Sequence, residues 1–382
     1  MTTVKMVKLG TLIKPAKLQK CGNDNYPVLS MTMHNGLVFQ SDKFKKSVAS
    51  QDKSTYKVVH RNQLVIGFPI DEGVLATQRI TDAGIVSPAY GIWDVDQTKI
   101  IPEFLEYALR CNRAIDYYKA KLRGSTARRR SLPTSTLLEL DVPLPDIEQQ
   151  KLALTTIHHA KNALDSRQAQ LTKLDELIKA RFVEMFGDPV TNPFNWPTVE
   201  LGQRCEIITG NTPSRAEPEN YGTFIEWIKS DNINTPSTFL TPAQEYLSEV
   251  GFQKCRFVES GSLLMTCIAG SLNCIGNVAV TNRRVAFNQQ INAITPTCDN
   301  VLYLYWLMIL SKPAIHKTIN MALKGILSKS QLSSIKFPFP SIECQNQFAA
   351  FVAEVDKSKV EVQKALDQTQ LLFDSLMQQY FG

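Results

Sequence analysis

The segment Val142–Gln150 reads VPLPDIEQQ, and 195 positions later Phe337–Gln345 reads FPFPSIECQ. Alternating prolines keep each copy extended, because proline fixes its own φ and disfavours the helical region for the residue before it. Asp146 and Ser341 then stand where helix N-caps belong, and an acidic residue follows in the first turn of each copy. Each copy therefore predicts an extended segment that leads directly into a helix.

A long helical pattern follows each copy of this phrase. Shifting the chain by 195 positions aligns residues 142–187 with residues 337–382 without a gap, and both segments end in Phe-Gly. About 39 residues of helix give a rod of roughly 58 Å at 1.5 Å per residue. The matched lengths and matched apolar spacing, that of an imperfect coiled-coil seam, lead us to expect that the two helices pack on each other. The predicted seam comprises Ile157, Ala160, Leu164, Arg167, Leu171, Leu174, Ile178, Arg181 and Met185 in the first helix, and Val352, Val355, Lys359, Val362, Leu366, Thr369, Phe373, Leu376 and Tyr380 in the second.

A weaker repeat fills the chain ahead of each helix. MVKLG near the start resembles TVELG at 198–202, so one unit is predicted at 1–141 and a second at 198–336. Each contains short β-rich runs and an apolar helix, which indicates an α+β fold with an internal pseudo-two-fold repeat. Residues 188–197, rich in Pro and Asn, are the predicted linker.

Composition narrows the classes of protein and of partner. The chain has 382 residues and a formal net charge of +6, which makes a polyanionic partner plausible. Eight cysteines show no CxxC pair, so we expect neither a zinc site nor a disulfide framework. The longest apolar run, at 301–310, is shorter than the roughly 20 residues of a membrane span, and the N-terminus has no signal-peptide core. We expect a cytoplasmic protein without a membrane partner.

These features together resemble the specificity subunits of type I restriction-modification systems. The resemblance covers essentially the whole chain and rests on the repeated Pro-x-Pro-x-Ile-Glu-x-Gln phrase and the helices that end in Phe-Gly. It also rests on YPVLSMTMHNGLVFQ and GIVSPAYGIWDV in the first half, and on ITGNTPSR and FNQQINAI in the second. The resemblance implies two α/β-type target recognition domains, separated by two long spacer helices that form an antiparallel coiled coil. In this chain they are recognition domains 1–141 and 198–336, and spacer helices 142–187 and 337–382.

The resemblance also implies a function and a set of partners. Each domain is expected to read one half of a bipartite site in double-stranded DNA, and the helices to set the spacing. Two methyltransferase (M) subunits are expected to dock on this frame, and restriction (R) subunits to complete the endonuclease. No cofactor is expected in this chain, and S-adenosylmethionine is expected in the methyltransferase subunit. Two dissimilar domain sequences on similar helices predict an asymmetric target, because different side chains read different base edges.

Basic and amide side chains mark the predicted DNA contacts. Arginines bind phosphate or guanine edges, amides suit adenine edges, and glycine and hydroxyl residues let a loop follow the backbone. A solvated surface is the alternative for every one of these residues. In the first half the predicted contacts are Lys121, Arg123, Gly124, Ser125, Thr126, Arg128, Arg129 and Arg130, with Lys43, Lys45 and Lys46 as weaker candidates. In the second half they are Lys229, Ser230, Asn232, Arg283, Arg284, Asn288, Gln289, Gln290, Lys324 and Lys329.

Two short motifs hint at catalysis. TNPFNWP at 191–197 is similar to the Asn/Asp-Pro-Pro-aromatic loop of amino methyltransferases, but it lacks one proline and a glycine-rich cofactor turn. Asp146, Glu148 and Lys151 are spaced like a nuclease motif, but they stand at a helix start with capping duties. With no nucleophile and base to nominate, we expect a non-catalytic subunit. The alternatives are a coiled-coil scaffold without DNA specificity, or a methyltransferase or nuclease in its own right.

Overall fold

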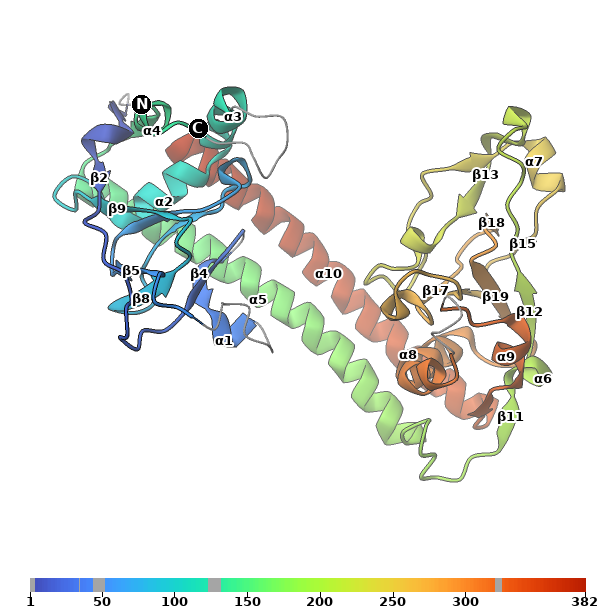
Figure 1. The fold of residues 1–382 in the computed structure, drawn as a ribbon. Coiled ribbons are helices and arrows are strands. Elements are labelled where there is room, and N and C mark those ends of the chain that lie inside the picture. The colour runs from blue at the N-terminus through green and yellow to red at the C-terminus, as the bar shows by residue number, and fades with distance from the viewer. Residues whose placement is uncertain (1–3, 34, 44–51, 123–131, 320–324) are drawn as a thin grey trace. The chain divides into compact units, whose positions relative to one another are not determined.

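The computed structural model describes residues 4–33, 35–43, 52–122, 132–319 and 325–382. The chain divides into two compact units (Figure 1). Unit 1 comprises Met1–Gln168 and Lys364–Gly382, and unit 2 comprises Ala169–Gln363. Each unit therefore contains one globular domain together with part of each long helix.

Unit 1 holds the first domain. Its strands are β1 (Met6–Lys8), β2 (Ile13–Pro15), β3 (Leu29–Thr32), β4 (Gly36–Phe39), β5 (Lys57–His60), β6 (Leu64–Ile66), β7 (Leu75–Thr77), β8 (Ala83–Val86), β9 (Gly91–Val95) and β10 (Asp141–Pro143). Its helices are η1 (Leu9–Thr11), α1 (Gln40–Lys43), η2 (Ile70–Glu72), α2 (Pro102–Arg110), α3 (Asn112–Lys121) and α4 (Thr134–Leu138). The long helix α5 (Ile147–Phe186) begins in this unit and ends in unit 2.

Unit 2 holds the second domain. Its strands are β11 (Thr198–Glu200), β12 (Cys205–Thr209), β13 (Tyr221–Ile228), β14 (Tyr246–Leu247), β15 (Phe257–Val258), β16 (Leu263–Thr266), β17 (Val278–Val280), β18 (Val285–Phe287), β19 (Ile291–Pro296) and β20 (Lys336–Pro338). Its helices are α6 (Leu201–Arg204), η4 (Pro218–Asn220), η5 (Ser230–Asn232), α7 (Glu249–Gln253), η6 (Leu272–Cys274), α8 (Val301–Lys317) and α9 (Lys329–Ser334). The long helix α10 (Ile342–Phe381) begins in this unit and ends in unit 1.

The two domains share one sheet topology. A four-stranded antiparallel sheet has the order β2-β9-β6-β7 in unit 1 and β12-β19-β16-β17 in unit 2. A second group of strands pairs β5 with β8 in unit 1 and β15 with β18 in unit 2. A parallel neighbour lies beside it in both units, where Val28 faces Ile85 and Trp227 faces Ala286. The predicted α+β fold with an internal repeat is confirmed.

Each copy of the repeated phrase closes its domain and then starts its helix. Its first proline ends a strand that pairs antiparallel with the first strand of the same domain, β10 with β1 and β20 with β11. The predicted N-caps are present, because Asp146 Oδ1 accepts a hydrogen bond from the Gln149 amide at 2.8 Å and Ser341 Oγ accepts one from the Cys344 amide at 3.5 Å. Each copy of the phrase thus joins the last strand of a domain to the long helix that follows it.

The last glutamine of the phrase fastens each long helix to its domain. Gln150 and Gln345 are both fully buried. Gln150 Oε1 accepts a hydrogen bond from the Ile101 amide at the start of α2, while its Nε2 donates to the carbonyls of Lys99 and Pro145. Gln345 repeats the arrangement with the Asn300 amide at the start of α8, Asp299 and the Pro340 carbonyl. Buried polar groups need such partners, so these two amides hold a defined geometry.

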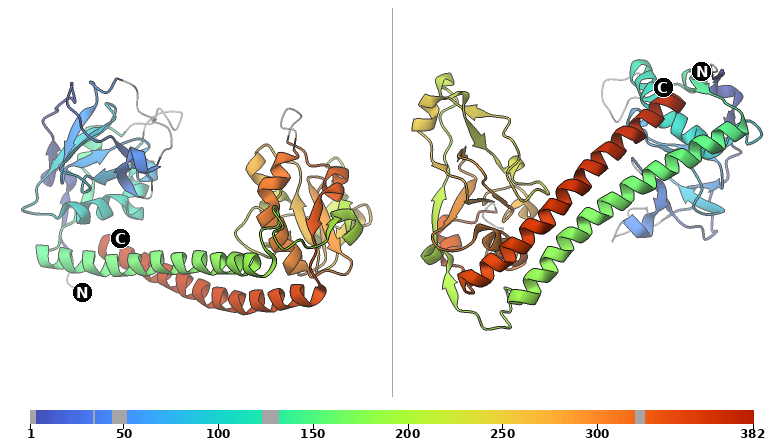
Figure 2. Two further views of the ribbon diagram at one scale, coloured as in Figure 1. Left: turned by 90° about the horizontal axis from the view of Figure 1, so that it is seen from below. Right: turned by 180° about the vertical axis from the view of Figure 1, so that it is seen from behind.

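The two long helices lie side by side within each unit (Figures 1 and 2). In unit 2, Asp175 of α5 meets Lys359 of α10 at 2.8 Å, whereas Phe182 meets Phe348 with ring centroids 5.3 Å apart. Positions that rise along one helix meet positions that fall along the other, so the pairing is antiparallel, as predicted. Lys359, a polar interruption of the predicted seam, is thus satisfied by a carboxylate across the pair.

In unit 1 the same two helices make a polar contact as well. Arg167 Nε of α5 donates to Thr369 Oγ1 of α10 at 3.1 Å. Both residues are polar interruptions of the predicted seam, and both are half-buried. Hydrogen bonding across the pair therefore offsets part of the cost of their polar groups.

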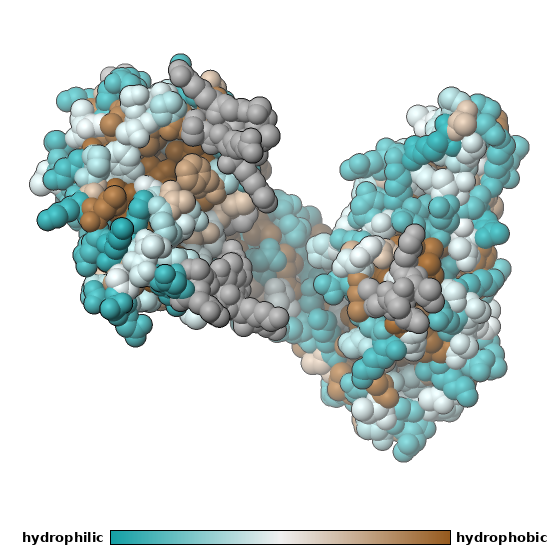
Figure 3. All heavy atoms as spheres, viewed as in Figure 1, coloured by the Kyte–Doolittle hydropathy of each residue, from teal (hydrophilic) through white to brown (hydrophobic). Residues whose placement is uncertain are grey.

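The surfaces are ordinary for a folded domain. On the face of each unit seen in Figure 3, hydrophilic residues predominate, with smaller hydrophobic areas among them. No helix in the described part of the chain combines the length and the hydropathy needed to cross a bilayer.

Candidate nucleic-acid interface

Five segments of unit 2 meet at one edge of its sheets. Strands β12, β13, β16 and β18 all run toward this edge, and the segments that follow them are joined by backbone hydrogen bonds. The Asn288 amide donates to the Ile228 carbonyl at 3.0 Å, the Cys267 amide to the Gln290 carbonyl at 2.8 Å, and the Leu327 amide to the Cys267 carbonyl at 2.9 Å. The Gly210 amide donates to the Ile291 carbonyl at 3.0 Å. We call this the loop edge of unit 2, made of residues 210–214, 229–234, 267–277, 288–290 and 325–328.

The three predicted amides Asn288, Gln289 and Gln290 differ in what they do at the loop edge. Asn288 is 7% exposed, and its side chain accepts from the Gln290 amide at 3.0 Å and donates to Gln290 Oε1 at 3.3 Å. These bonds hold the turn in shape. Gln289 is exposed, and no hydrogen bond of its side chain is found among the described residues. Of the three, Gln289 presents a free amide to a ligand.

The segment Lys229–Asn232 joins the same edge through its backbone. Asn232 is 6% exposed; its side chain accepts from the Lys229 amide at 3.1 Å and donates to the Pro242 carbonyl at 3.0 Å. Lys229 Nζ pairs with Glu245, and this ammonium is the largest cause of the lowered pKa of that carboxyl. Ser230, between them, is half-buried. The structure thus brings Lys229–Asn232 and Asn288–Gln290 together.

Arg283 and Arg284 stand at the opposite end of β18 from the amides. Arg283 Nη2 lies 3.0 Å from Glu226 Oε1, and its guanidinium also donates to the carbonyls of Leu240 and Thr241. The contact holds the pKa of Glu226 below its usual value. Arg284 Nε donates to Glu259 Oε1 at 2.7 Å. Sequence proximity had grouped these arginines with the amides, and three strand residues separate them.

The remaining predicted contacts are placed in part. Lys329 is exposed at the start of α9, directly after the loop edge, and Lys121 is exposed at the end of α3. Lys43 ends α1, and its side chain is not among those described. The other predicted contacts lie outside the described residues: Lys45, Lys46, Arg123, Gly124, Ser125, Thr126, Arg128, Arg129, Arg130 and Lys324.

Unit 1 has an edge at the equivalent place. Ser87, Pro88 and Ala89 follow β8 there, as Asn288, Gln289 and Gln290 follow β18 in unit 2. The segment is held by Lys57, whose Nζ donates to the Tyr90 carbonyl at 2.6 Å. On the same edge η2 packs against α3, where Ile70 shares a hydrophobic cluster with Ala114 and Tyr118. The GIVSPAYGIWDV and FNQQINAI phrases therefore occupy the same position in the two domains, with different side chains.

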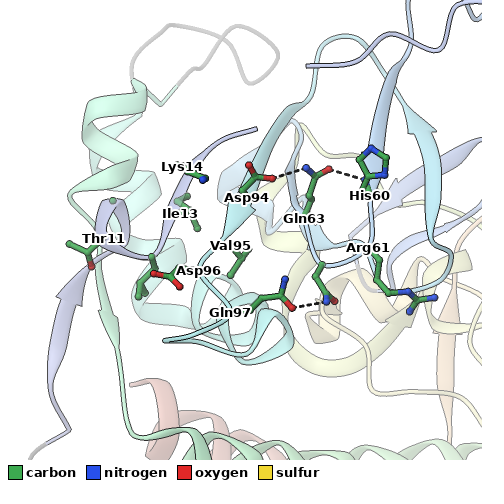
Figure 4. Close-up of a pocket in the computed structure, with 13 residues that line it drawn as sticks. Thr11, Ile13, Lys14, His60, Arg61, Gln63, Asp94, Val95, Asp96 and Gln97 are labelled. Atoms are coloured by element: carbon green, nitrogen blue, oxygen red, sulfur yellow. Dashed lines mark hydrogen bonds between the residues drawn. The ribbon is translucent and has the colours of Figure 1, made fainter. Parts of the chain in front are cut away.

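A polar hollow of about 720 Å³ lies at the other end of the unit 1 sheet (Figure 4). Its side chains largely pair with one another: Gln63 donates to Asp94 at 2.8 Å, and Asn62 donates to Gln97 at 2.8 Å. Asp96 accepts from Lys99 and Thr98, contacts that lower its pKa to about 2. Within the described ranges no group of three or more His, Cys, Asp and Glu residues could hold a metal ion. We assign no chemistry to the hollow.

Sequence reasoning did not nominate the segment Cys267–Asn277 for the loop edge of unit 2. It carries asparagine and serine side chains and is bound at both ends to other segments of the edge. The available signal was Gly270 and Gly276 among Ser and Asn, a composition typical of a turn. Gly276 has a φ of 80°, in the left-handed region that favours glycine.

Comparisons with known proteins find similar sequences. A model described as "Type I restriction modification DNA specificity domain" matches residues 193–369. The specificity subunit of the type I restriction enzyme HindI from Haemophilus influenzae is 28% identical over 187 residues, 46% of this chain and 39% of that subunit. The EcoBI specificity subunit from Escherichia coli is 21% identical over 406 residues, 91% of this chain and 82% of that subunit.

The fold is also that of a solved type I restriction-modification protein. A chain from structural work on complex assembly and conformational transition of the type I R-M system superposes with a TM-score of 0.58. The match has 16% identity and covers 99% of this chain and 97% of that one. The chain spans only 39% of the HindI subunit's length, whereas its fold matches almost the whole solved chain. With its repeated junctions and antiparallel helices, this chain is similar in sequence and in fold to the specificity subunits of type I restriction-modification systems.

Proposed function

We propose that this chain reads a bipartite, asymmetric DNA site for a type I restriction-modification complex. Recognition domains at 1–141 and 198–336 each read one half of the site, and spacer helices at 142–187 and 337–382 set the distance between the halves. Residues 188–197 link the first helix to the second domain. Relatives are specificity subunits, so the role is recognition rather than catalysis.

One observation carries the proposal. Two domains of the same topology present equivalent edges, and the equivalent segments read Ser-Pro-Ala in one and Asn-Gln-Gln in the other. A protein that reads two half-sites needs two such domains in one frame. Different side chains at the same place would select different bases, which favours an asymmetric target.

Gln289 is the base-reading residue we propose for unit 2. It is exposed and unpaired among the described residues, and a glutamine amide can hydrogen-bond an adenine edge bidentately. Lys229, Ser230, Asn232 and Gln290 support the loop edge around it, and Lys329 is a candidate phosphate contact. The basic segment between α3 and α4 is the proposed backbone contact of the first domain.

The helices support docking of two methyltransferase subunits. Leu177 in unit 2 and Leu372 in unit 1 are 195 positions apart and therefore equivalent in the repeat. Their side chains are 48% and 55% exposed, so both are accessible to a partner. Two equivalent apolar positions suit two copies of one partner. S-adenosylmethionine and the methyl transfer belong to that partner, and restriction subunits complete the assembly.

The experiment co-expresses this chain with its partner methyltransferase subunit and maps N6-methyladenine across the host DNA. We expect a two-part motif with a fixed gap. Exchanging residues 198–336 for those of another family member should change one half of the motif and leave the other half intact. A complex that forms without altering methylation would favour the scaffold alternative and defeat the proposal.

A single substitution then tests the proposed reader. Gln289→Ala should relax one base position of the half read by unit 2, by about 1–3 kcal/mol of discrimination. Gln203→Ala is the matched control, because Gln203 is exposed on α6, at the far end of β12 from the loop edge. An unchanged motif for Gln289→Ala would exclude Gln289 as a base reader.

A further inference from the structure

Helix α8 is hydrogen-bonded to the loop edge of unit 2 through Lys312. Its Nζ lies 2.7 Å from the Asn273 carbonyl oxygen and is also hydrogen-bonded to Asn277 Oδ1. One turn along the helix, His316 Nε2 lies 2.8 Å from the Ile275 carbonyl oxygen. Gly276 lies between these contacts, and a Cβ there would come within 3.4 Å of Lys312 Cγ. The segment Cys267–Asn277 is therefore seated directly on α8.

Further hydrogen bonds connect this segment to its neighbours at the loop edge. Asn277 Nδ2 donates to Asn234 Oδ1 at 2.6 Å, and the Asn234 amide donates to the Ser230 carbonyl at 2.9 Å. At the other end of the segment, the Cys267 and Ile268 amides both donate to the Gln290 carbonyl, at 2.8 and 3.2 Å. Hydrogen bonds thus lead from Lys312 to the segment Lys229–Asn232, and the chain of Cys267–Asn277 carries the connection on to Asn288–Gln290.

The other end of α8 is fastened to the long helices. Tyr303 packs against Phe182 and Phe186 of α5, with ring centroids 5.5 and 5.0 Å away. The Asn300 amide at the start of α8 is held by Gln345 of α10. Because the same helix makes both sets of contacts, it connects the spacer helices to the loop edge.

The contacts of the Lys312 ammonium should contribute little to the stability of the fold. Its side chain is partly buried, and in the described structure its ammonium bonds neutral oxygens and pairs with no carboxylate. Burial lowers its pKa below the ordinary lysine value. A charge removed from water without an opposite charge contributes little net stability, and an apolar residue of similar volume is often tolerated. Charged hydrogen bonds nevertheless fix the geometry of the atoms that accept them.

We propose that Lys312 is a positioning residue for DNA recognition by unit 2, acting through Asn277 and Asn234 rather than by contact with a base. His316 supports the same segment. This inference rests on the proposed function and deepens it, since it names a specificity determinant away from the bases. The backbone around Gln289 is held by the same connection, because the segments beside it are hydrogen-bonded to a segment seated on α8.

The test is the methylation map of Lys312→Met with the partner methyltransferase subunit. The half-motif read by unit 2, identified by the exchange of residues 198–336, should lose about tenfold in discrimination at one or more positions, since one base contact is worth about that much. The other half-motif and the thermal stability of the chain should not fall. Lys317→Met is the matched control: it removes the same charge from an exposed side chain near the end of α8.

A second variant covers the possibility that Lys312→Met stops methylation altogether. Asn277→Ala breaks the same connection from the loop side and should relax the same half-motif. In the double variant, Lys312→Met should add little to Asn277→Ala, because both act on one connection. If the wild-type chain directs a two-part motif while Asn277→Ala keeps full discrimination in both halves, the inference is overturned. A wild-type chain that directs no two-part motif would instead refute the proposed function, and the inference with it.

Discussion

The two units fasten the same kind of domain to the same pair of helices by different chemistry. In unit 2, Phe182 and Phe186 of α5, Tyr303 of α8 and Phe348 of α10 form one aromatic cluster with centroids 5.0–5.6 Å apart. Tyr303 is fully buried, its hydroxyl donates to the Pro338 carbonyl at 2.7 Å, and burial raises its pKa. The ring contacts of this cluster are apolar, and the Tyr303 hydroxyl is its polar group.

In unit 1 an aromatic contact is combined with charge. Phe381 of α10 packs on Phe104 of α2 with centroids 4.9 Å apart. Beside it, Glu103 of α2 lies 2.5 Å from Arg79 and 2.9 Å from His158 of α5. At the position of Glu103, counted from the amide that the buried glutamine holds, α8 of unit 2 has Leu302.

The difference separates what the repeat keeps from what it varies. Each long helix begins at one domain with a buried glutamine and ends at the other with a buried phenylalanine, Gln150 and Phe186 in α5, Gln345 and Phe381 in α10. These fastenings recur in both units, whereas the surroundings of Glu103 and Leu302 do not. The repeated residues therefore define the frame, and the contacts around them differ between the units.

The largest effect should come from the aromatic cluster of unit 2. Phe182→Ala removes a fully buried ring and leaves a cavity, at a cost of about 3–5 kcal/mol in the free energy of unfolding. Hydrogen exchange measured by mass spectrometry should then accelerate in α8 while α2 is little changed. Met377→Ala is the control, since Met377 is the equivalent residue in the repeat and is only half-buried. Equal effects of the two variants would contradict the contrast between the units.

The buried glutamines should come next, with equal effects in the two units. Gln150→Ala leaves the Ile101 amide without a hydrogen-bond acceptor, and Gln345→Ala does the same to the Asn300 amide. Each variant should lose about 2–3 kcal/mol in the free energy of unfolding, because a buried donor loses its partner. Exchange should accelerate at the start of α2 in the first variant and of α8 in the second. Gln149→Ala is the control, because its amide is exposed at the helix start. A clear inequality between the two would show that the frame is not symmetric.

The repeat made the frame predictable from sequence. Proline spacing, the caps at Asp146 and Ser341, and the Phe-Gly ends predicted both long helices, because those signals are local in the chain. The role of Gln150 was not predicted, although its repetition at Gln345 was visible, because its partner Ile101 is 49 residues away. The role of Gln150 depends on the burial of its side chain, and that burial results from tertiary packing.

The candidate interface was harder to predict for the same reason. The sequence placed Arg283 and Gln289 in one group, since they are close in the chain. Strand β18 lies between them. The Arg283 guanidinium donates a hydrogen bond to Glu226, which is 57 residues away in the chain. Neither fact can be derived from a short window. Asn288–Gln290 lie on the loop edge of unit 2, and their contact with DNA stays a prediction.

The smallest predicted effect concerns the charged contact of unit 1. Glu103→Gln removes the charge that faces Arg79 and His158, and should cost about 1 kcal/mol at low salt, because these partners are partly exposed. Raising the salt concentration should shrink that difference, since ions screen a partly exposed pair. The measurement is the denaturant midpoint of unit 1 at two salt concentrations, followed by hydrogen exchange in α2. The matched control is Leu302→Met in unit 2, whose small effect should not depend on salt. A salt-independent cost for Glu103→Gln would mean that the carboxylate acts through packing, and that the two units are fastened by the same chemistry.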